Sequence, residues 1–309
     1  MEKAFFYILA LLLLLSCGQS EEVRKRVDRE QQLELKRQDS LALKIATAPT
    51  LDCMPLYVAK EQLLFDTLGV DVRLRCYTSQ MDCDTAMRGG SVEGVVSDLV
   101  RTERLARQGV EMQYVAATGN YWLLMANHRS RVKRVEQLGD KIIAMTRFSA
   151  TDWLSDSFLK GVKMKGQVYR VQINDVNIRL RMLLNNELDA VWLSEPLATV
   201  ARQNGHMQIA DSRDKLVSLG VVAFRKKALR DHRRQQQLAL FVRAYNMACD
   251  SLNANGLSRY SAVLKKYYNI DKRAIAKLPR VKFMHAAAPG RQNEEKVAAF
   301  VEETLHTSY

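Results

Sequence analysis

Residues 41–65, LALKIATAPTLDCMPLYVAKEQLLF, set a plan that the rest of the chain repeats. Apolar residues alternate with other residues from Leu41 to Ile45, which predicts a short strand, and Pro49 ends it. After a polar turn, a helix is predicted from about Met54, since a proline in the first helical turn has no hydrogen bond to lose. This order places the loop at the carboxyl end of the strand, where open α/β sheets bind ligands. The buried face of the helix is predicted to comprise Leu56, Ala59, Leu63 and Leu64.

The same alternation of strand and helix continues along the chain, which argues for a mainly parallel sheet. It starts again near residues 119–121, so a boundary between two lobes is predicted there. Predicted strands lie at 70–76, 92–97, 112–117, 121–126, 141–145, 169–173, 189–193 and 217–224. Predicted helices lie at about 81–88, 99–108, 151–160, 176–184, 233–254, 258–268 and 293–305, with another from Pro196.

The segment 217–224 is predicted to return to the first lobe, so the chain crosses between the lobes twice. The predicted organisation is a first lobe of residues 42–119 plus 216–309 and a second lobe of residues 120–215. Lobes of this length match ordinary domain sizes. The 47% hydrophobic content supplies enough apolar residues for two cores.

Further segments on this plan carry a resemblance to a known family: VEGVVSDLV at 92–100, TRFSATDWL at 146–154 and INDVNIRLRMLLNNELDAVWLSEPLAT at 173–199. The chain resembles bacterial ABC-transporter substrate-binding lipoproteins, in the branch that takes up nitrate, alkanesulfonates, taurine and thiamine precursors. The resemblance implies an α/β fold of the periplasmic-binding-protein type II class. In that fold each lobe is a mainly parallel sheet flanked by helices, and the ligand cleft lies between the lobes. It also implies a small-molecule ligand, with a membrane permease and its ATPase as partners.

The N-terminus has the features of an exported protein. Residues 1–16 hold an early lysine and then an apolar run too short to span a bilayer, which is typical of a signal peptide. The sequence LLSCG at 14–18 resembles the lipobox of bacterial lipoproteins, in which Cys17 becomes the lipidated first residue. Residues 17–41 are nearly all polar and are predicted to be a tether with some helix. We expect lipid anchoring to a bacterial membrane in the cell envelope; the alternative is a plain signal peptide with a chance cysteine.

The chain is strongly basic, with a formal net charge of +13. Such a charge is compatible with nucleic-acid binding, but the basic residues are spread out, no nucleic-acid motif is present and the chain carries an export signal. A basic surface that faces anionic lipid or an acidic partner fits better, and a solvated surface without a role is the alternative. We expect a monomer with no nucleic-acid partner.

Cysteines and histidines do not predict a metal or another cofactor. No two cysteines have metal-ligand spacing, and the five histidines are scattered. Cys53 and Cys83 both follow predicted first-lobe strands at the same edge, so a disulfide between them is one possibility. Cys76 lies within a predicted strand and is expected to be a buried thiol.

Loops at the carboxyl ends of the predicted strands supply the candidate ligand-binding residues. Ser149 and Thr151 are good N-caps, and the free amides and dipole of that helix attract anions. In the family that the chain resembles, this loop holds the acidic or polar head of the ligand; simple capping is the alternative. The first lobe contributes Asp52, Ser97, Asp98, Asn120 and Tyr121, and the second contributes Ser149, Ala150, Thr151, Asp175 and Glu195.

The sequence leaves two classes of ligand open, an amine and an anion. Several acids converging on one pocket suit an amine-bearing heteroaromatic molecule, such as a thiamine-precursor pyrimidine, because a buried charge needs a partner. Glu195, fixed by Pro196, is the first candidate to bind the amine. The helix terminus at Ser149 suits a sulfonate or nitrate-like anion instead.

Other functional classes have less support. The chain has no G-x-S-x-G, phosphate-binding glycine loop or H-E-x-x-H motif. Enzymes of the same fold, such as pyrimidine synthases and menaquinone-pathway enzymes, are cytoplasmic, and the lipobox argues against them. A non-transport sensor lipoprotein is a further alternative.

Overall fold

The computed structural model describes residues 21–306, so the predicted signal peptide and Cys17 lie outside the described residues. The chain divides into a unit ending at Ala42 and a unit beginning at Leu43. In the first, α2 (Glu21–Leu41) is a polar helix that ion pairs between successive turns stabilise, such as Lys25 to Glu21 at 2.8 Å. No helix in residues 21–306 is long and apolar enough to cross a membrane.

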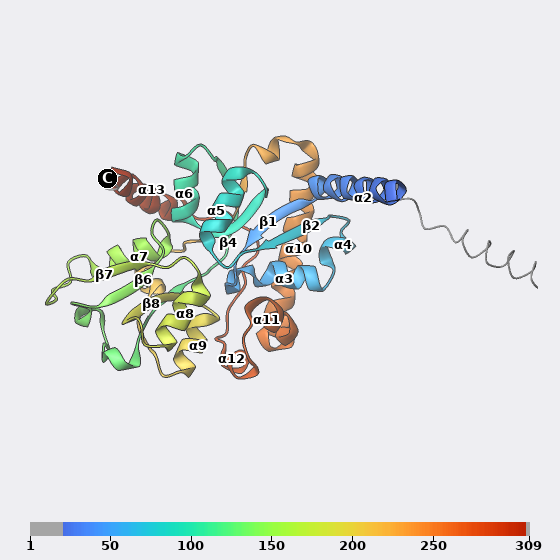
Figure 1. The fold of residues 1–309 in the computed structure, drawn as a ribbon. Coiled ribbons are helices and arrows are strands. Elements are labelled where there is room, and N and C mark those ends of the chain that lie inside the picture. Colours follow the sequence, from blue (N-terminus) through green and yellow to red (C-terminus); the bar gives the residue numbers. More distant parts are fainter. Residues whose placement is uncertain (1–20, 307–309) are drawn as a thin grey trace, which may run out of the picture. The chain divides into compact units, whose positions relative to one another are not determined.

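The second unit contains two five-stranded sheets of the same design (Figure 1). The first sheet has the order β2-β1-β3-β10-β4 and the second the order β7-β6-β8-β5-β9. The first comprises β1 (Leu43–Thr47), β2 (Val72–Cys76), β3 (Gly94–Asp98), β4 (Met112–Ala117) and β10 (Gly220–Arg225). The second comprises β5 (Trp122–Ala126), β6 (Ile142–Met145), β7 (Tyr169–Gln172), β8 (Ala190–Ser194) and β9 (Met207–Asp211).

Each sheet contains one strand that runs against the other four. β10 pairs antiparallel with both β3 and β4, and β5 pairs antiparallel with both β8 and β9. The remaining pairs, β1 with β2 and β3, and β6 with β7 and β8, are parallel. The sheets are therefore mixed, although four strands of each point in one direction. The two reversed strands are those that follow a crossing between the sheets, which the alternation of strand and helix did not predict.

Helices cover both sheets (Figure 1). Those of the first lobe are α3 (Met54–Glu61), α4 (Leu64–Thr67), α5 (Gln80–Gly89), α6 (Leu99–Arg107), α10 (His232–Asn255), α11 (Ser261–Tyr268) and α12 (Lys272–Lys277). Those of the second are α7 (Ala150–Leu159), α8 (Val176–Leu184) and α9 (Leu197–Gln203), and the last helix, α13 (Arg291–His306), lies beside α6. The fold is a two-lobe α/β fold, as the sequence predicted. The lobe limits at 42–119, 216–309 and 120–215 stay predictions.

One prediction for the first helix is wrong. Leu63 was expected on its buried face, but 60% of its surface is exposed. Its backbone is left-handed, with φ of 56°, and this breaks the predicted helix into α3 and α4 because that conformation cannot continue a helix. Leu63 therefore points away from the core.

The two crossing segments contact each other. The first joins β4 to β5 and the second leads into β10, and the N–H of Thr118 donates to the carbonyl of Gly220 at 2.9 Å. A Cβ atom at Gly220 would lie 2.3 Å from the Thr118 Oγ1 and 2.8 Å from the Asn120 Cβ. The close approach of the two crossings therefore requires glycine at position 220.

Candidate functional site

The carboxyl ends of the strands face each other across the cleft between the lobes, and in this structure the lobes touch there. The N–H of Leu51 donates to the carbonyl of Glu195 at 3.0 Å. The N–H of Ala150 donates to the Asp98 Oδ1 at 3.0 Å, and Ser79 forms an antiparallel bridge with Asp175. Each contact joins a residue of the first lobe to a residue of the second. The structure is therefore a closed conformation with direct contacts where the sequence predicted a ligand.

Asp98 links the first turns of two helices. Its Oδ1 accepts from the N–H of Arg101, which caps its own helix α6, and also from the N–H of Ala150, the first residue of α7. The side chain is fully buried, and burial is the largest cause that raises the pKa of Asp98 to about 7. Its other oxygen, Oδ2, has no hydrogen-bond partner among the described residues.

Two more buried polar atoms at the same edge of the first sheet have no partner within the described part of the chain. They are the Asp52 Oδ1, in the loop after β1, and the Ser97 Oγ, in the neighbouring strand β3. The other Asp52 oxygen accepts from the Thr118 hydroxyl at 3.3 Å, and burial raises the pKa of Asp52 to about 6. An unpaired buried polar atom costs about 1–3 kcal/mol, so such atoms usually indicate a missing water or ligand.

The acids predicted in the second lobe are already paired. The Asp175 Oδ1 caps α8 by accepting from the N–H groups of Asn177 and Ile178 at 2.8 and 3.1 Å. One Glu195 oxygen accepts from the Thr199 N–H and hydroxyl at 3.0 and 2.7 Å, and the other accepts from the Arg202 guanidinium. Glu195 therefore has an internal cation as its partner.

The start of α7 is also satisfied within the chain. The Ser149 hydroxyl caps the helix by accepting from the Thr151 N–H at 3.1 Å, and the Thr151 hydroxyl accepts from the Thr146 N–H at 3.0 Å. The N–H of Ala150 donates to the Asp98 carboxylate. The N–H groups of Ala150 and Thr151 are therefore both occupied in the closed conformation.

Asn120 and Tyr121 line a small central cavity together with Asp52, Thr118 and Glu195. Its volume is about 10 Å³, which is room for about one water molecule. The Tyr121 ring lies 4.1 Å from the Arg213 guanidinium, and burial raises the pKa of Tyr121 to about 12. A small organic ligand fits at these residues only when the lobes separate.

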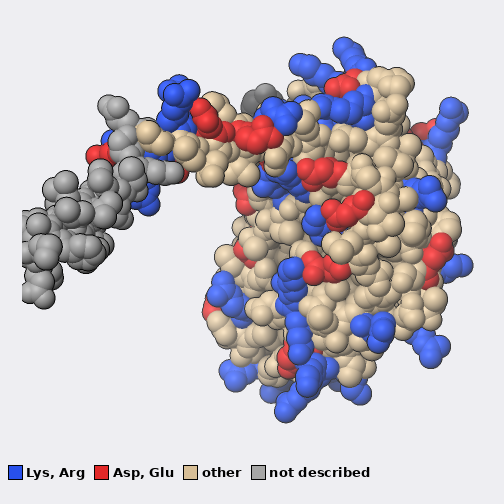
Figure 2. All heavy atoms as spheres, turned by 90° about the vertical axis from the view of Figure 1, so that its right-hand side faces the viewer, with Lys and Arg blue, Asp and Glu red and all other residues tan. Residues whose placement is uncertain are grey.

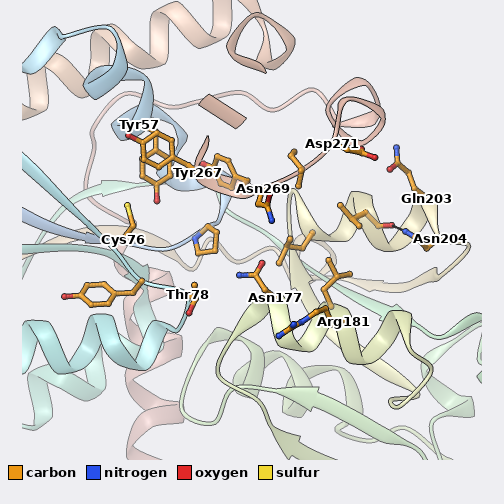
Figure 3. Close-up of a pocket in the computed structure, with 17 residues that line it drawn as sticks. Tyr57, Cys76, Thr78, Asn177, Arg181, Gln203, Asn204, Tyr267, Asn269 and Asp271 are labelled. Atoms are coloured by element: carbon orange, nitrogen blue, oxygen red, sulfur yellow. Dashed lines mark hydrogen bonds between the residues drawn. The ribbon is translucent and has the colours of Figure 1, made fainter. Parts of the chain in front are cut away.

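A larger groove of about 680 Å³ opens beside the central cavity, between elements of both lobes, which is a volume typical of ligand pockets. Figure 3 shows Tyr57 and Tyr267 on one side and Asn177 and Arg181, from α8, on the other. The two tyrosine rings stack with centroids 3.9 Å apart. The sequence prediction missed Tyr267, Asn177 and Arg181, because they lie within helices that only the tertiary fold brings to the cleft.

Comparison with known families identifies the chain. The model of the family described as NMT1/THI5 like matches residues 50–255, two thirds of the chain. The protein belongs to the NMT1/THI5-like family. No curated protein matches it significantly.

Solved structures share the fold of this NMT1/THI5-like protein at low sequence identity. The periplasmic aliphatic sulphonate binding protein SsuA from Escherichia coli is 17% identical with a TM-score of 0.68, covering 85% of this chain and 87% of its own. The nitrate-binding protein NrtA from Synechocystis PCC 6803 is 12% identical with a TM-score of 0.69, covering 85% of each chain. The ligand-binding component of an ABC-type import system from Staphylococcus aureus is 14% identical with a TM-score of 0.68, and the match covers 85% of this chain and 91% of that one. The fold is that of periplasmic binding proteins, as the resemblance implied.

The four cysteines that this NMT1/THI5-like protein carries within residues 21–306 are free thiols. Cys53 and Cys83 are buried and do not form the disulfide that their positions made possible. Instead their sulfurs approach oxygens of Thr50 and Thr47 at 3.8 and 3.9 Å. Cys76 is exposed rather than buried. Within residues 21–306, no group of three His, Cys, Asp or Glu side chains is arranged to hold a metal ion.

The burial of Asp98 predicts a pH effect on stability. Its pKa in the folded protein, about 7, lies above the ordinary value of about 4. The folded state therefore binds this proton more tightly, and the resulting stabilisation is lost as the pH rises from about 4 to about 7. Asp98→Asn removes the titrating group, so the variant should not lose this stability as the pH rises. The unfolding free energy of the variant minus that of the wild type should therefore increase from about pH 4 to about pH 7. Urea unfolding at several pH values measures it; a constant difference would contradict the prediction.

Proposed function

We propose that the protein is the solute-binding component of an ABC importer. It would capture a small polar molecule between its lobes and deliver it to a membrane permease driven by an ATPase. Membership of the NMT1/THI5-like family and the periplasmic-binding-protein fold support this role. The solved structures with the same fold include proteins named for binding sulphonate and nitrate. Ligand residues in both lobes suit a mechanism in which the lobes separate to admit the ligand and then close around it.

The proposal includes a lipid anchor. Cys17, in the lipobox-like sequence, is the proposed site of acylation, and the polar segment with α2 is the proposed tether to the membrane of the cell envelope. Each buried methylene adds about 0.8 kcal/mol, so several acyl chains hold a protein on a membrane. Mass spectrometry of membrane-extracted protein tests this part, and an unmodified Cys17 would refute it. We propose a monomer.

The unpaired atoms Asp52 Oδ1 and Asp98 Oδ2 carry the proposal for the ligand. Both are carboxylate oxygens, so they need a ligand that donates hydrogen bonds, and a cationic amine is the strongest such donor. Ser97 supplies a hydroxyl beside them. An amine-bearing heteroaromatic molecule therefore fits better than a sulfonate or nitrate, because buried carboxylates repel an anion.

A thermal-shift screen tests the proposal. The compounds are aminopyrimidines, alkanesulfonates and nitrate, and a true ligand at 100 times its dissociation constant should stabilise the protein by about 2.7 kcal/mol. Aminopyrimidines are expected to give the largest shift. The matched controls are the same rings without the amino group, which should not shift the transition. Stabilisation by sulfonates alone would refute the amine, and no stabilisation by any compound would count against a small-molecule ligand of these classes.

A further inference from the structure

A second groove, of about 780 Å³, lies in the first lobe and is lined entirely by residues between Leu252 and Phe283. It lies between the end of α10 and the segment that follows α12, and it shares only Val281 and Phe283 with the central cavity. Its floor is apolar and belongs to the first-lobe core. The buried floor residues are Leu252, Leu257, Ile275 and Phe283.

The segment along this groove has the pattern of an unpaired edge strand. Arg280 and Lys282 are exposed, whereas Val281 is half-buried and Phe283 is buried, which is the alternation of an extended chain. The backbone N–H and carbonyl of Phe283 pair with the Asn253 side chain at 2.9 and 2.8 Å. The backbone groups of residues 280–282 make no hydrogen bond within the described chain. They are free to pair with another extended segment.

The same region is strongly basic. Between Leu257 and Phe283 the chain carries eight Lys and Arg residues and one acid, Asp271. Of the eight, only Lys266 makes an ion pair within residues 21–306, with Glu61 at 2.8 Å. Figure 2 shows mainly Lys and Arg along the lower margin of the face drawn there, the margin where α12 lies in Figure 1. The region therefore attracts negative charge.

We propose that the groove of residues 252–283 binds an extended acidic segment of a partner protein. The segment adds as a strand along residues 280–282, and its backbone pairs with the free groups there. Acidic side chains at alternate positions then face Arg280 and Lys282, since alternate residues of a strand lie on one face. The intervening apolar side chains cover the floor. An anionic membrane would use the charges but leave the free backbone groups and the recessed floor unused, so a protein segment fits better.

Fluorescence anisotropy with labelled synthetic peptides tests the proposal on the protein without its signal peptide. The probe is an EVEVEVE peptide, and the controls are EEVVEEV, which has the same composition without the alternation, and KVKVKVK. The alternating acidic peptide is expected to bind at least tenfold more tightly than either control. Equal binding of the two acidic peptides would overturn strand addition. Vesicles with anionic phospholipid form a further arm, and vesicle binding without peptide binding would assign the surface to a membrane instead.

Variants locate the site. The double variant Arg280→Glu with Lys282→Glu should bind the EVEVEVE peptide at least tenfold more weakly than the wild type does. The matched control, Lys163→Glu with Lys165→Glu, reverses two exposed charges in the second lobe and should leave binding unchanged. Val281→Pro removes one backbone donor without a charge change and should also weaken binding. Circular dichroism checks that each variant folds. Binding unaffected by Val281→Pro, or equally reduced by both charge reversals, would overturn the proposal.

Discussion

A disulfide between positions 79 and 175 is expected to reduce ligand affinity by at least about a hundredfold, because it holds the lobes shut. Ser79 and Asp175 form an antiparallel bridge, and bridged residues have Cα atoms about 4.5–5.5 Å apart, within the range of a disulfide. The closed central cavity holds about 10 Å³. Apparent affinity falls with the fraction of molecules that can open, and a locked protein has almost none.

The locking experiment contains its own control. Ser79→Cys with Asp175→Cys is made in a Cys76→Ser background, because the exposed Cys76 thiol would otherwise compete. The substitutions also remove the caps of α5 and α8, which costs about 1 kcal/mol each, so the oxidised protein is compared with the same protein after reduction. Calorimetry of both forms measures the effect. If the oxidised form binds the ligand as tightly as the reduced form, the ligand does not enter between the lobes.

Arg101→Leu is expected to destabilise the protein by about 3–5 kcal/mol, because it leaves a buried carboxylate without its cation. Arg101 and Asp84 form an ion pair whose side chains are only 2% and 18% exposed. Burial is the largest cause that raises the pKa of Asp84, and the neighbouring Arg101 opposes that rise. Urea unfolding of the variant measures the loss of stability.

The double variant Arg101→Leu with Asp84→Leu separates the lost pair from lost packing. Replacing both partners by apolar residues of similar size is often neutral, so the double variant should recover much of the stability that the single variant loses. A single variant as stable as the wild type would show that Asp84 does not depend on Arg101.

The sequence predicted the fold well where a strand is buried on both faces. The apolar run after Asp189 became β8, all of whose residues are buried. The direction of β5 and β10 was not predictable from local pattern, because a strand's direction in a sheet depends on where the chain arrives from. The break at Leu63 escaped prediction because its left-handed backbone has no signal in an apolar sequence.

The candidate site shows a different limit. Polar side chains after a strand are suited both to cap a helix and to bind a ligand, and the sequence does not distinguish the two uses. Asp175 and Glu195 bind groups of their own chain, whereas Asp52 keeps an unpaired oxygen. Asp98 receives an N–H from Ala150, which is far away in sequence. The tertiary structure therefore makes Asp52, rather than Glu195, the first candidate to bind the amino group of the ligand.

Calorimetric titration of the best compound from the screen into wild type, Asp52→Asn and Asp66→Asn tests the central claim most directly. Breaking a buried charged pair costs about 3–5 kcal/mol, so Asp52→Asn should weaken an amine ligand by about a hundredfold or more at 1.4 kcal/mol per decade. Asp66→Asn removes an exposed acid on α4 and should leave affinity unchanged. Affinity that is equal in all three proteins, or higher in Asp52→Asn, would contradict an amine bound between the lobes.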